Sequence, residues 1–155
     1  MTRDRESVRV VATNRKARRA FHVLESVECG IQLVGTEVKS LRSGQVSIAE
    51  AYGQIKRGEL WLFGASIAEY SHGNIQNHVP DRPRKLLLHR RELASWHKEV
   101  KLKGVTIVPL RIYFKGHLVK VEMALVRGKK LYDRREDQKK RSDRREMERA
   151  MSRRR

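Results

Sequence analysis

The stretch VTIVPLRIYFKGHLVKVEMALVRG, residues 105–128, is the clearest structural signal in the chain. Apolar residues alternate through both of its halves, as in β-strands, and Lys115-Gly116 between them predicts a tight turn. Pro109 indicates an edge position or a bulge, because proline has no backbone N–H to donate. The stretch therefore predicts an antiparallel hairpin. Its core-facing residues are expected to be Val108, Leu110, Ile112 and Phe114 in the first strand and Val119, Val121, Met123 and Leu125 in the second.

Two segments upstream also predict strands. Residues 52–67, YGQIKRGELWLFGASI, predict a hairpin that turns at Arg57-Gly58. The residues of this hairpin expected to face the core are Trp61, Phe63, Ala65 and Ile67. Residues 21–34 predict a strand in two halves, bent or bulged at Gly30.

The helical patterns are shorter and lie between the strands. Thr36 can cap a helix of about two turns that stops at Gly44. Residues 84–104 carry the longest helical pattern and are expected to lie across the sheet as a lid. Residues 70–83 are rich in Gly, Asn, Asp and Pro and predict a mobile loop. The whole pattern favours a mainly β fold, an oligonucleotide-binding-type antiparallel β-barrel flanked by about three helices; an open sheet with helices on one face is the alternative.

The charge of the chain is strongly positive, at +18. Residues 128–155 hold 13 Lys and Arg against 6 Asp and Glu, and the rest of the chain is basic as well. Such an excess predicts a polyanionic partner, with nucleic acid as the first candidate. A membrane surface is a weaker candidate, because the tail lacks a broad apolar face with Trp or Phe. We expect residues 1–16 to be a mobile basic arm, 17–128 a β-barrel domain and 129–155 a basic tail.

Several other classes of function find little support in the sequence. Cys29 is the only cysteine, so no internal disulfide can form, and His72, His78 and Asp81 are too few and too loosely spaced for a usual zinc site. No nucleophile elbow, apolar carboxylate pair or phosphate-binding glycine loop is present. We therefore expect no enzyme activity, no metal and no cofactor. The absence of an apolar leader or membrane span predicts a cytoplasmic location.

Two basic clusters are candidate RNA contacts. NRKARRAF, residues 14–21, can grip phosphates with its cations while Asn14 hydrogen-bonds a base or sugar; a solvated basic arm is the alternative. RPRKLLLHRR, residues 82–91, flanks three leucines with Arg82, Arg84 and Lys85. A helix can bury about two of the three leucines, so one is left to stack on an RNA base or sugar. A plain core helix with basic flanks is the commoner explanation of this second cluster.

Five motifs, in unbroken order, resemble SmpB, the family of tmRNA-binding proteins of bacterial ribosome rescue. They are NRKAR (14–18), GTEVKSLR (35–42), RPRKLLLHRREL (82–93), IVPLRIYFK (107–115) and KVEMALVRGKKLYDRRE (120–136). The resemblance implies an oligonucleotide-binding-type barrel that clasps the tRNA-like domain of tmRNA and enters the vacant decoding site of a stalled ribosome. The barrel would stand in for the missing anticodon arm, and the tail would occupy the empty message channel.

The resemblance also nominates residues. By motif match, the tmRNA contacts implied are Asn14, Lys16, Arg18, Glu28, Leu87 and Lys120. The basic clusters add Arg84 and Lys85. The junction between barrel and tail adds Lys129 and Lys130. Contacts implied in the decoding centre are Tyr132, which would stack on a base of the small-subunit rRNA, Asp133, Arg134 and Arg135. The sequence departs from the pattern at Arg19, Ala20 and Phe21, where relatives often have His, an acid and Tyr, and at Cys29, a usual Ala.

The tail itself predicts a segment that folds on binding. It has no Gly or Pro after Gly128, and Glu136–Lys140 and Asp137–Arg141 are spaced to support a helix. Its few apolar residues cannot offset the entropy of ordering, so we expect disorder when it is free and helix on the ribosome, where Met147, Ala150 and Met151 form one small apolar stripe. Elongation factor Tu is expected on the same tmRNA without a required direct contact, and the protein is expected to be a monomer. A generic RNA-binding, ribosome-associated barrel and a small nuclease are the rival hypotheses.

Overall fold

The computed structural model describes residues 7–72, 77–102, 104–129 and 131–153, the first four of the last range without their side chains. Its helices are α1 (Arg15–Ala20), α2 (Gly35–Arg42), α3 (Arg90–Glu99) and α4 (Leu131–Arg153). Its strands are β1 (Val8–Thr13), β2 (Phe21–Ile31), β3 (Val46–Ser47), β4 (Tyr52–Lys56), β5 (Glu59–Phe63), β6 (Ser66–Ile67), β7 (Arg84–Leu87), β8 (Val105–Lys115) and β9 (Leu118–Gly128).

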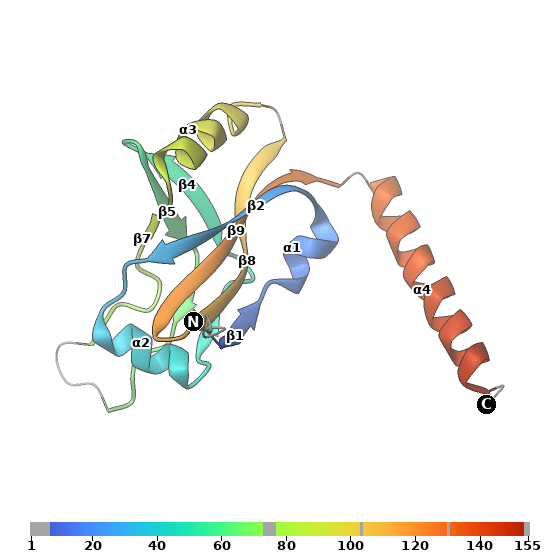
Figure 1. Cartoon of the computed structure of the whole chain (residues 1–155), viewed down its shortest axis with the longest axis horizontal. Coiled ribbons are helices and arrows are strands. Elements are labelled where there is room, and N and C mark those ends of the chain that lie inside the picture. Colours follow the sequence, from blue (N-terminus) through green and yellow to red (C-terminus); the bar gives the residue numbers. More distant parts are fainter. Residues whose placement is uncertain (1–6, 73–76, 103, 130, 154–155) are drawn as a thin grey trace, which may run out of the picture.

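The main sheet closes on itself. Its strands follow the order β1-β8-β4-β5-β7-β2-β9, and β9 also pairs with β8, so the strands from β8 to β9 form a closed ring to which β1 adds at β8. Every described pairing is antiparallel. In Figure 1 the long, curved β2, β8 and β9 cross the middle of the body, while α2 and α3 lie at opposite ends of it. This arrangement confirms the prediction of an oligonucleotide-binding-like β-barrel fold.

The β8–β9 hairpin forms as predicted, with one change of phase. Its turn lies at Gly116-His117, one residue later than predicted. The register shifts between Pro109 and Arg111, which confirms the bulge. The predicted residues of β8 are all buried, but not on one face: Ile112 and Phe114 join the main core, whereas Val108 and Leu110 join a second cluster with Ala17 of α1. The bulge causes this difference, because one extra residue exchanges the two faces of a strand.

The β4–β5 hairpin also forms, but its predicted phase is wrong. Arg57 and Gly58 both have positive φ, as a two-residue turn of this type requires. Leu60 and Leu62 are fully buried, so Trp61 and Phe63 point to the outer face. Ala65 and Ile67 are buried as predicted, because Gly64, at φ +74°, interrupts the alternation between them and β5.

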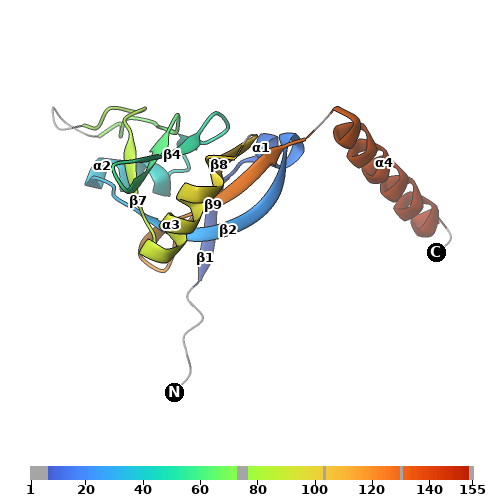
Figure 2. The same ribbon diagram turned by 90° about the horizontal axis from the view of Figure 1, so that it is seen from above.

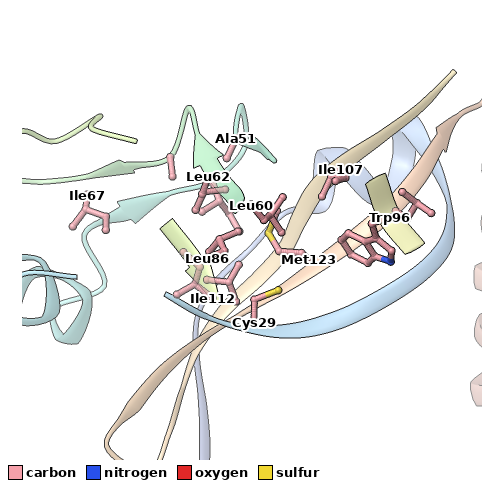
Figure 3. Packing of buried hydrophobic residues seen from close by; sticks show 14 of the residues in the cluster. Cys29, Ala51, Leu60, Leu62, Ile67, Leu86, Trp96, Ile107, Ile112 and Met123 are labelled. Carbon is pink, nitrogen blue, oxygen red and sulfur yellow. The ribbon is translucent and has the colours of Figure 1, made fainter. Parts of the chain in front are cut away.

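The predicted long helix over 84–104 is two elements. Residues 84–87 form β7, which joins β5 to β2, and the helix α3 begins only at Arg90. A short apolar run cannot distinguish strand from helix by its period alone, which is why the leucines were misassigned. Trp96 of α3 is fully buried in the main core, beside residues of the β-strands (Figure 3). The helix α3 thus packs against the main core through Trp96, at one end of the body rather than across the sheet (Figure 1).

Two other local predictions are wrong. The strand β2 is continuous from Phe21 to Ile31, and its register shifts between Val23 and Glu25 rather than at Gly30. The helix α2 begins after Val34, whose N–H donates to the carboxylate of Glu37, so Thr36 is not its cap. Thr36 instead contacts His78, with 2.8 Å between its Oγ1 and Nδ1.

The N-terminal segment is part of the sheet from Val8 onward. Residues 8–13 pair with β8, so the prediction of a mobile arm is wrong there; residues 1–6 lie outside the described part. Asn14 ends this strand and begins α1. Its side chain accepts from Ala17 N at 3.0 Å and donates to the carbonyls of Ile48 and Pro109, at 3.2 and 3.0 Å. These bonds fasten the start of α1 to the barrel.

The helix α4 projects away from the body (Figure 2). Its 23 residues give it a length of about 35 Å. The described residues of both apolar clusters come from other elements, so α4 contributes nothing to the core. Among the described helices, none has the length and apolar character needed to cross a membrane.

Candidate nucleic-acid interface

Three residues nominated from distant parts of the chain meet on one outer surface of the barrel. Gly30 of β2 pairs with Leu87 of β7 on one side and with Lys120 of β9 on the other. Glu28 lies two residues earlier on β2 and therefore on the same face. A Cβ added at Gly30 would come within 3.3 Å of the Cβ of Leu87, so the glycine lets β7 approach closely. We call Glu28, Gly30, Leu87 and Lys120 the β2 surface.

Leu87 is the leucine of the triplet that leaves the core. Its side chain is 46% exposed, whereas Leu86 is 2% exposed. The alternation of β7 explains this choice, since Arg84 and Leu86 face inward and Lys85 and Leu87 face outward. An exposed leucine between a lysine and a carboxylate offers a nonpolar contact for the face of a base or a ribose.

Glu28 is held in its ionised form. The hydroxyl of Tyr113 donates to its Oε2, and Lys115 Nζ lies 3.3 Å from its Oε1. The bond from Tyr113, followed by the lysine charges, lowers the pKa of Glu28 below its usual value. Burial and the bond to Glu28 raise the pKa of Tyr113, which therefore remains a hydrogen-bond donor. Among the described residues, Lys120 has no hydrogen bond or ion pair and keeps its ammonium group available to a ligand.

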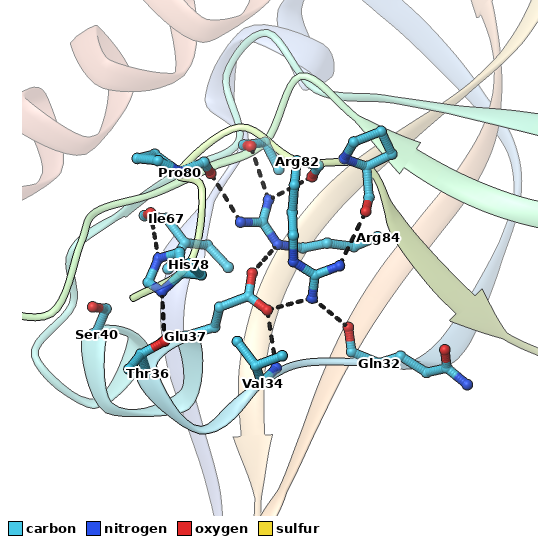
Figure 4. Close-up of polar contacts among 12 residues, drawn as sticks. Gln32, Val34, Thr36, Glu37, Ser40, Ile67, His78, Pro80, Arg82 and Arg84 are labelled. Atoms are coloured by element: carbon cyan, nitrogen blue, oxygen red, sulfur yellow. Dashed lines mark hydrogen bonds and ion pairs between the residues drawn. The ribbon is translucent and has the colours of Figure 1, made fainter. Parts of the chain in front are cut away.

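Arg84 is not available to RNA, and its nomination is wrong. It is 0% exposed, and its Nε donates to Glu37 at 2.5 Å (Figure 4). Its other donors reach the carbonyls of Ala65, Arg82 and Pro80 at 3.1, 3.1 and 2.8 Å. The sequence pattern failed here because it treats arginine as a surface residue, and the buried carboxylate that pairs with it is 47 residues away.

Glu37 is the centre of this buried network. Burial alone would raise its pKa, but bonds from Arg82, the N–H of Val34 and Arg84 outweigh burial, so the pKa of Glu37 is lowered. One carboxylate thus ties α2 to β7 and to the residues before it. Since β7 also carries Leu87, the network positions one part of the β2 surface.

His78 is also structural. Its ring contacts Thr36 and, through Nε2 at 2.9 Å, the carbonyl of Ile67, and the residue is 6% exposed. Residues around His78 such as Pro80 are fastened by Arg84, which argues against mobility for this part of the predicted loop.

Within the described ranges, no group of His, Cys, Asp and Glu could hold a metal ion. Burial raises the pKa of Cys29 to about 12, so its thiol is inert.

The nomination of Asn14 is wrong for the same reason as that of Arg84. Its side chain is 2% exposed, and its amide and carbonyl are used by internal bonds. Lys16 and Arg18, on the outer side of α1, are exposed. Lys16 Nζ lies 2.5 Å from Glu50, in an ion pair whose partners are both largely in solvent and which is therefore weak. Lys85 is half-buried and pairs with Glu59 at 2.9 Å.

A second basic region lies between α1 and α4. One cleft, of about 490 Å³, is lined by Lys16, Arg19, Ala20, Lys129, Asp137, Gln138 and Arg141. Lys129 donates to Asp137 there and lowers the pKa of that carboxyl group. A neighbouring hollow is lined by arginines alone, namely Arg15, Arg18, Arg19, Arg141 and Arg145. Seven residues of β2, 21–27, separate Ala20 of this region from Glu28 of the β2 surface, which is a span of about 26 Å along an extended strand.

The nominated tail residues can be followed only in part. Lys130 lies outside the described residues, as do the side chains of Tyr132, Asp133 and Arg134. Arg135 is exposed on α4, and Met147 and Met151 are exposed near its far end. The helical form of the tail is thus present in the structure, while its disorder in the free protein stays a prediction.

Sequence reasoning missed Tyr113 and Lys115. Both come from β8 and meet Glu28 across β9. The alternation of side chains along β8 could have shown that Tyr113 points to the opposite face of the strand from Ile112 and Phe114. No local pattern, however, shows which strands of a barrel lie close enough for their side chains to form a hydrogen bond.

Comparisons with known proteins agree with this geometry. The family described as "SmpB protein" matches residues 11–153. An SsrA-binding protein of Corynebacterium jeikeium is 54% identical over 145 residues, covering 94% of this chain and 79% of the relative. One of Carboxydothermus hydrogenoformans is 48% identical over 143 residues, covering 92% and 96%. A solved structure described as "tmRNA-SmpB: a journey to the center of the bacterial ribosome" superposes with a TM-score of 0.65 and 46% identity, covering 77% of this chain and 85% of that one.

Proposed function

The chain belongs to the SmpB family, and from this premise we propose that it binds tmRNA and acts in trans-translation on stalled ribosomes. The observation that carries the proposal is the convergence of Glu28, Leu87 and Lys120 around Gly30. These residues offer an acceptor, a nonpolar contact and a cation on one rigid surface, which is a suitable set for a folded RNA. The β2 surface takes the tRNA-like domain of tmRNA, with Lys85 at its border.

The second basic region belongs to the same proposal. Lys16, Arg18 and Lys129 neutralise further phosphates near the junction of barrel and tail. Beyond this junction Lys130 continues the contact with RNA. The decoding-centre contacts are Tyr132, Asp133, Arg134 and Arg135, and Met147 and Met151 contact the message channel farther on.

The proposed work of the chain is to present shape and charge. Peptide transfer belongs to the ribosome, and no step of it is assigned to a side chain here. The protein acts as a monomer in the cytoplasm, where ribosomes are, and elongation factor Tu binds the same tmRNA without needing to touch it. The alternative function is that of a generic RNA-binding barrel associated with ribosomes.

Competition for binding separates these two functions. The full chain is bound to a labelled tRNA-like domain of tmRNA, and bulk tRNA is added at one fixed salt concentration, because affinity for RNA depends on salt. We expect a large excess of bulk tRNA to leave most of the complex intact. Displacement at equal concentrations of the two RNAs would instead favour the generic barrel.

The tail is proposed to fold when it enters its RNA-lined channel. Its described side chains are almost all exposed on α4, including Met147 and Met151, so packing adds little to helix stability. Repulsion among its cations opposes the helix until a polyanion neutralises them. Circular dichroism of a peptide of residues 129–155 should show little helix in dilute buffer and more on addition of a polyanion. A strongly helical spectrum in buffer alone would refute folding on binding.

A further inference from the structure

The outer face of the β4–β5 hairpin carries aromatic side chains that the β2 surface does not use. Gly53 faces the core, since a Cβ there would lie 2.8 Å from Ile107. Its neighbours on β4 therefore point outward, opposite the outward residues of β5. The outward pairs are Tyr52 with Phe63, Gln54 with Trp61 and Lys56 with Glu59. Three aromatic residues thus share one two-stranded surface.

Tyr52 is the most open of these residues. It is 47% exposed, and its ring stacks on Phe63 with 5.6 Å between centroids and 18° between planes. Lys56 Nζ lies 4.8 Å from the centroid of Phe63. Phe63 therefore contacts both Tyr52 and Lys56, and the tyrosine ring is already oriented before any ligand arrives. Aromatic rings on the solvent-exposed face of a sheet commonly stack with unpaired RNA bases.

A hollow adjoins the platform on the side of α1. Its volume is about 320 Å³, and its lining includes Tyr52, Phe21, Lys16, Glu50 and Val108. Its floor is largely apolar, and Glu50, the acid in its lining, is already paired with Lys16. On the far side of the platform Glu59 is paired with Lys85, while Lys56 and Arg57 make no ion pair with any described residue. Lys56 and Arg57 are therefore the cations beside the aromatic residues that remain available to a phosphate backbone.

We propose that this face is a further RNA-binding site, at which an unpaired base stacks on Tyr52 while Lys56 and Arg57 contact the neighbouring phosphates. In the closed sheet β5 pairs with β7, which carries Leu87 of the β2 surface, and Lys85 of β7 pairs with Glu59 of β5. The aromatic face therefore adjoins the β2 surface along β7. The proposed function enters this inference only through the class of partner, RNA.

The test compares tyrosine variants of the full chain. The probe is a short single-stranded RNA that carries one fluorescent adenine analogue, whose emission falls on stacking. Tyr52→Ala should weaken binding about tenfold and abolish most of the quenching. Tyr52→Phe keeps the ring and should bind within about twofold of the wild type. Tyr70→Ala is the matched control, because Tyr70 is another partly exposed tyrosine beside a lysine, with Lys39 at 5.4 Å.

Two further arms identify the source of the RNA. The same variants are titrated with the tRNA-like domain of tmRNA and with ribosomes, and thermal melting confirms that each is folded. A loss confined to Tyr52→Ala with either RNA supports the site and names its source. Equal binding of Tyr52→Ala and wild type to all three probes overturns the proposal, as does an equal loss in Tyr70→Ala. The single-stranded probe contains no tmRNA, so this arm decides the stacking proposal even where the tmRNA function fails.

Discussion

Lys120→Glu should weaken binding to the tRNA-like domain of tmRNA by about 3 kcal/mol, which is roughly a hundredfold. The variant loses a cation that makes no hydrogen bond or ion pair with the described residues, and it places a second acid beside Glu28. Glu122, opposite Glu28 on β9, adds little to this repulsion, because Arg111 pairs with it at 2.5 Å. Filter binding or anisotropy over a range of salt concentrations measures the effect. The dependence of affinity on salt should also fall by about one phosphate contact.

The control must change the total charge equally at another place. Lys98→Glu on α3 meets this need, because Lys98 is exposed and lies outside the proposed contacts. This substitution should lower the affinity for the tRNA-like domain only slightly at physiological salt, where charges farther apart than about 8 Å are screened. Lys120→Arg keeps the charge and should retain most of the affinity. Equal losses in Lys120→Glu and Lys98→Glu would show that net charge, not the β2 surface, controls binding.

Much of the fold follows from local patterns, and the errors in strand phase share a cause. The β8–β9 and β4–β5 hairpins could be predicted because alternation and turn residues are local properties. The face of a strand that packs into the core is predicted wrongly wherever a single residue interrupts the alternation. The bulge after Pro109 and the positive φ of Gly64 each have this effect, and neither can be placed by counting apolar residues.

The site could be predicted only through the resemblance to a family. Glu28, Leu87 and Lys120 belong to three strands, and no spacing in the sequence shows that these strands are neighbours. The nominations of Asn14 and Arg84 as RNA contacts are wrong because polar side chains are usually exposed. Asn14 instead bonds to buried backbone carbonyls, and Arg84 pairs with a buried carboxylate. The outward aromatics of β5 were missed through the same phase error that assigned Trp61 and Phe63 to the core.

Removal of the tail should separate the two halves of the function. A chain that ends at Lys130 keeps every described residue of both apolar clusters, so we expect its barrel to fold. It also keeps the β2 surface, but it loses Arg135 and the remainder of α4. The removed residues carry net positive charge, so a modest loss of tmRNA affinity at low salt is expected from long-range attraction alone. At physiological salt that loss should be under about fivefold.

The most direct test of this division measures tmRNA affinity and tagging of nascent chains on stalled ribosomes with the same truncated protein. We expect near-normal affinity at physiological salt together with loss of tagging. A fall in affinity as large as that of Lys120→Glu, or normal tagging without the tail, would contradict it.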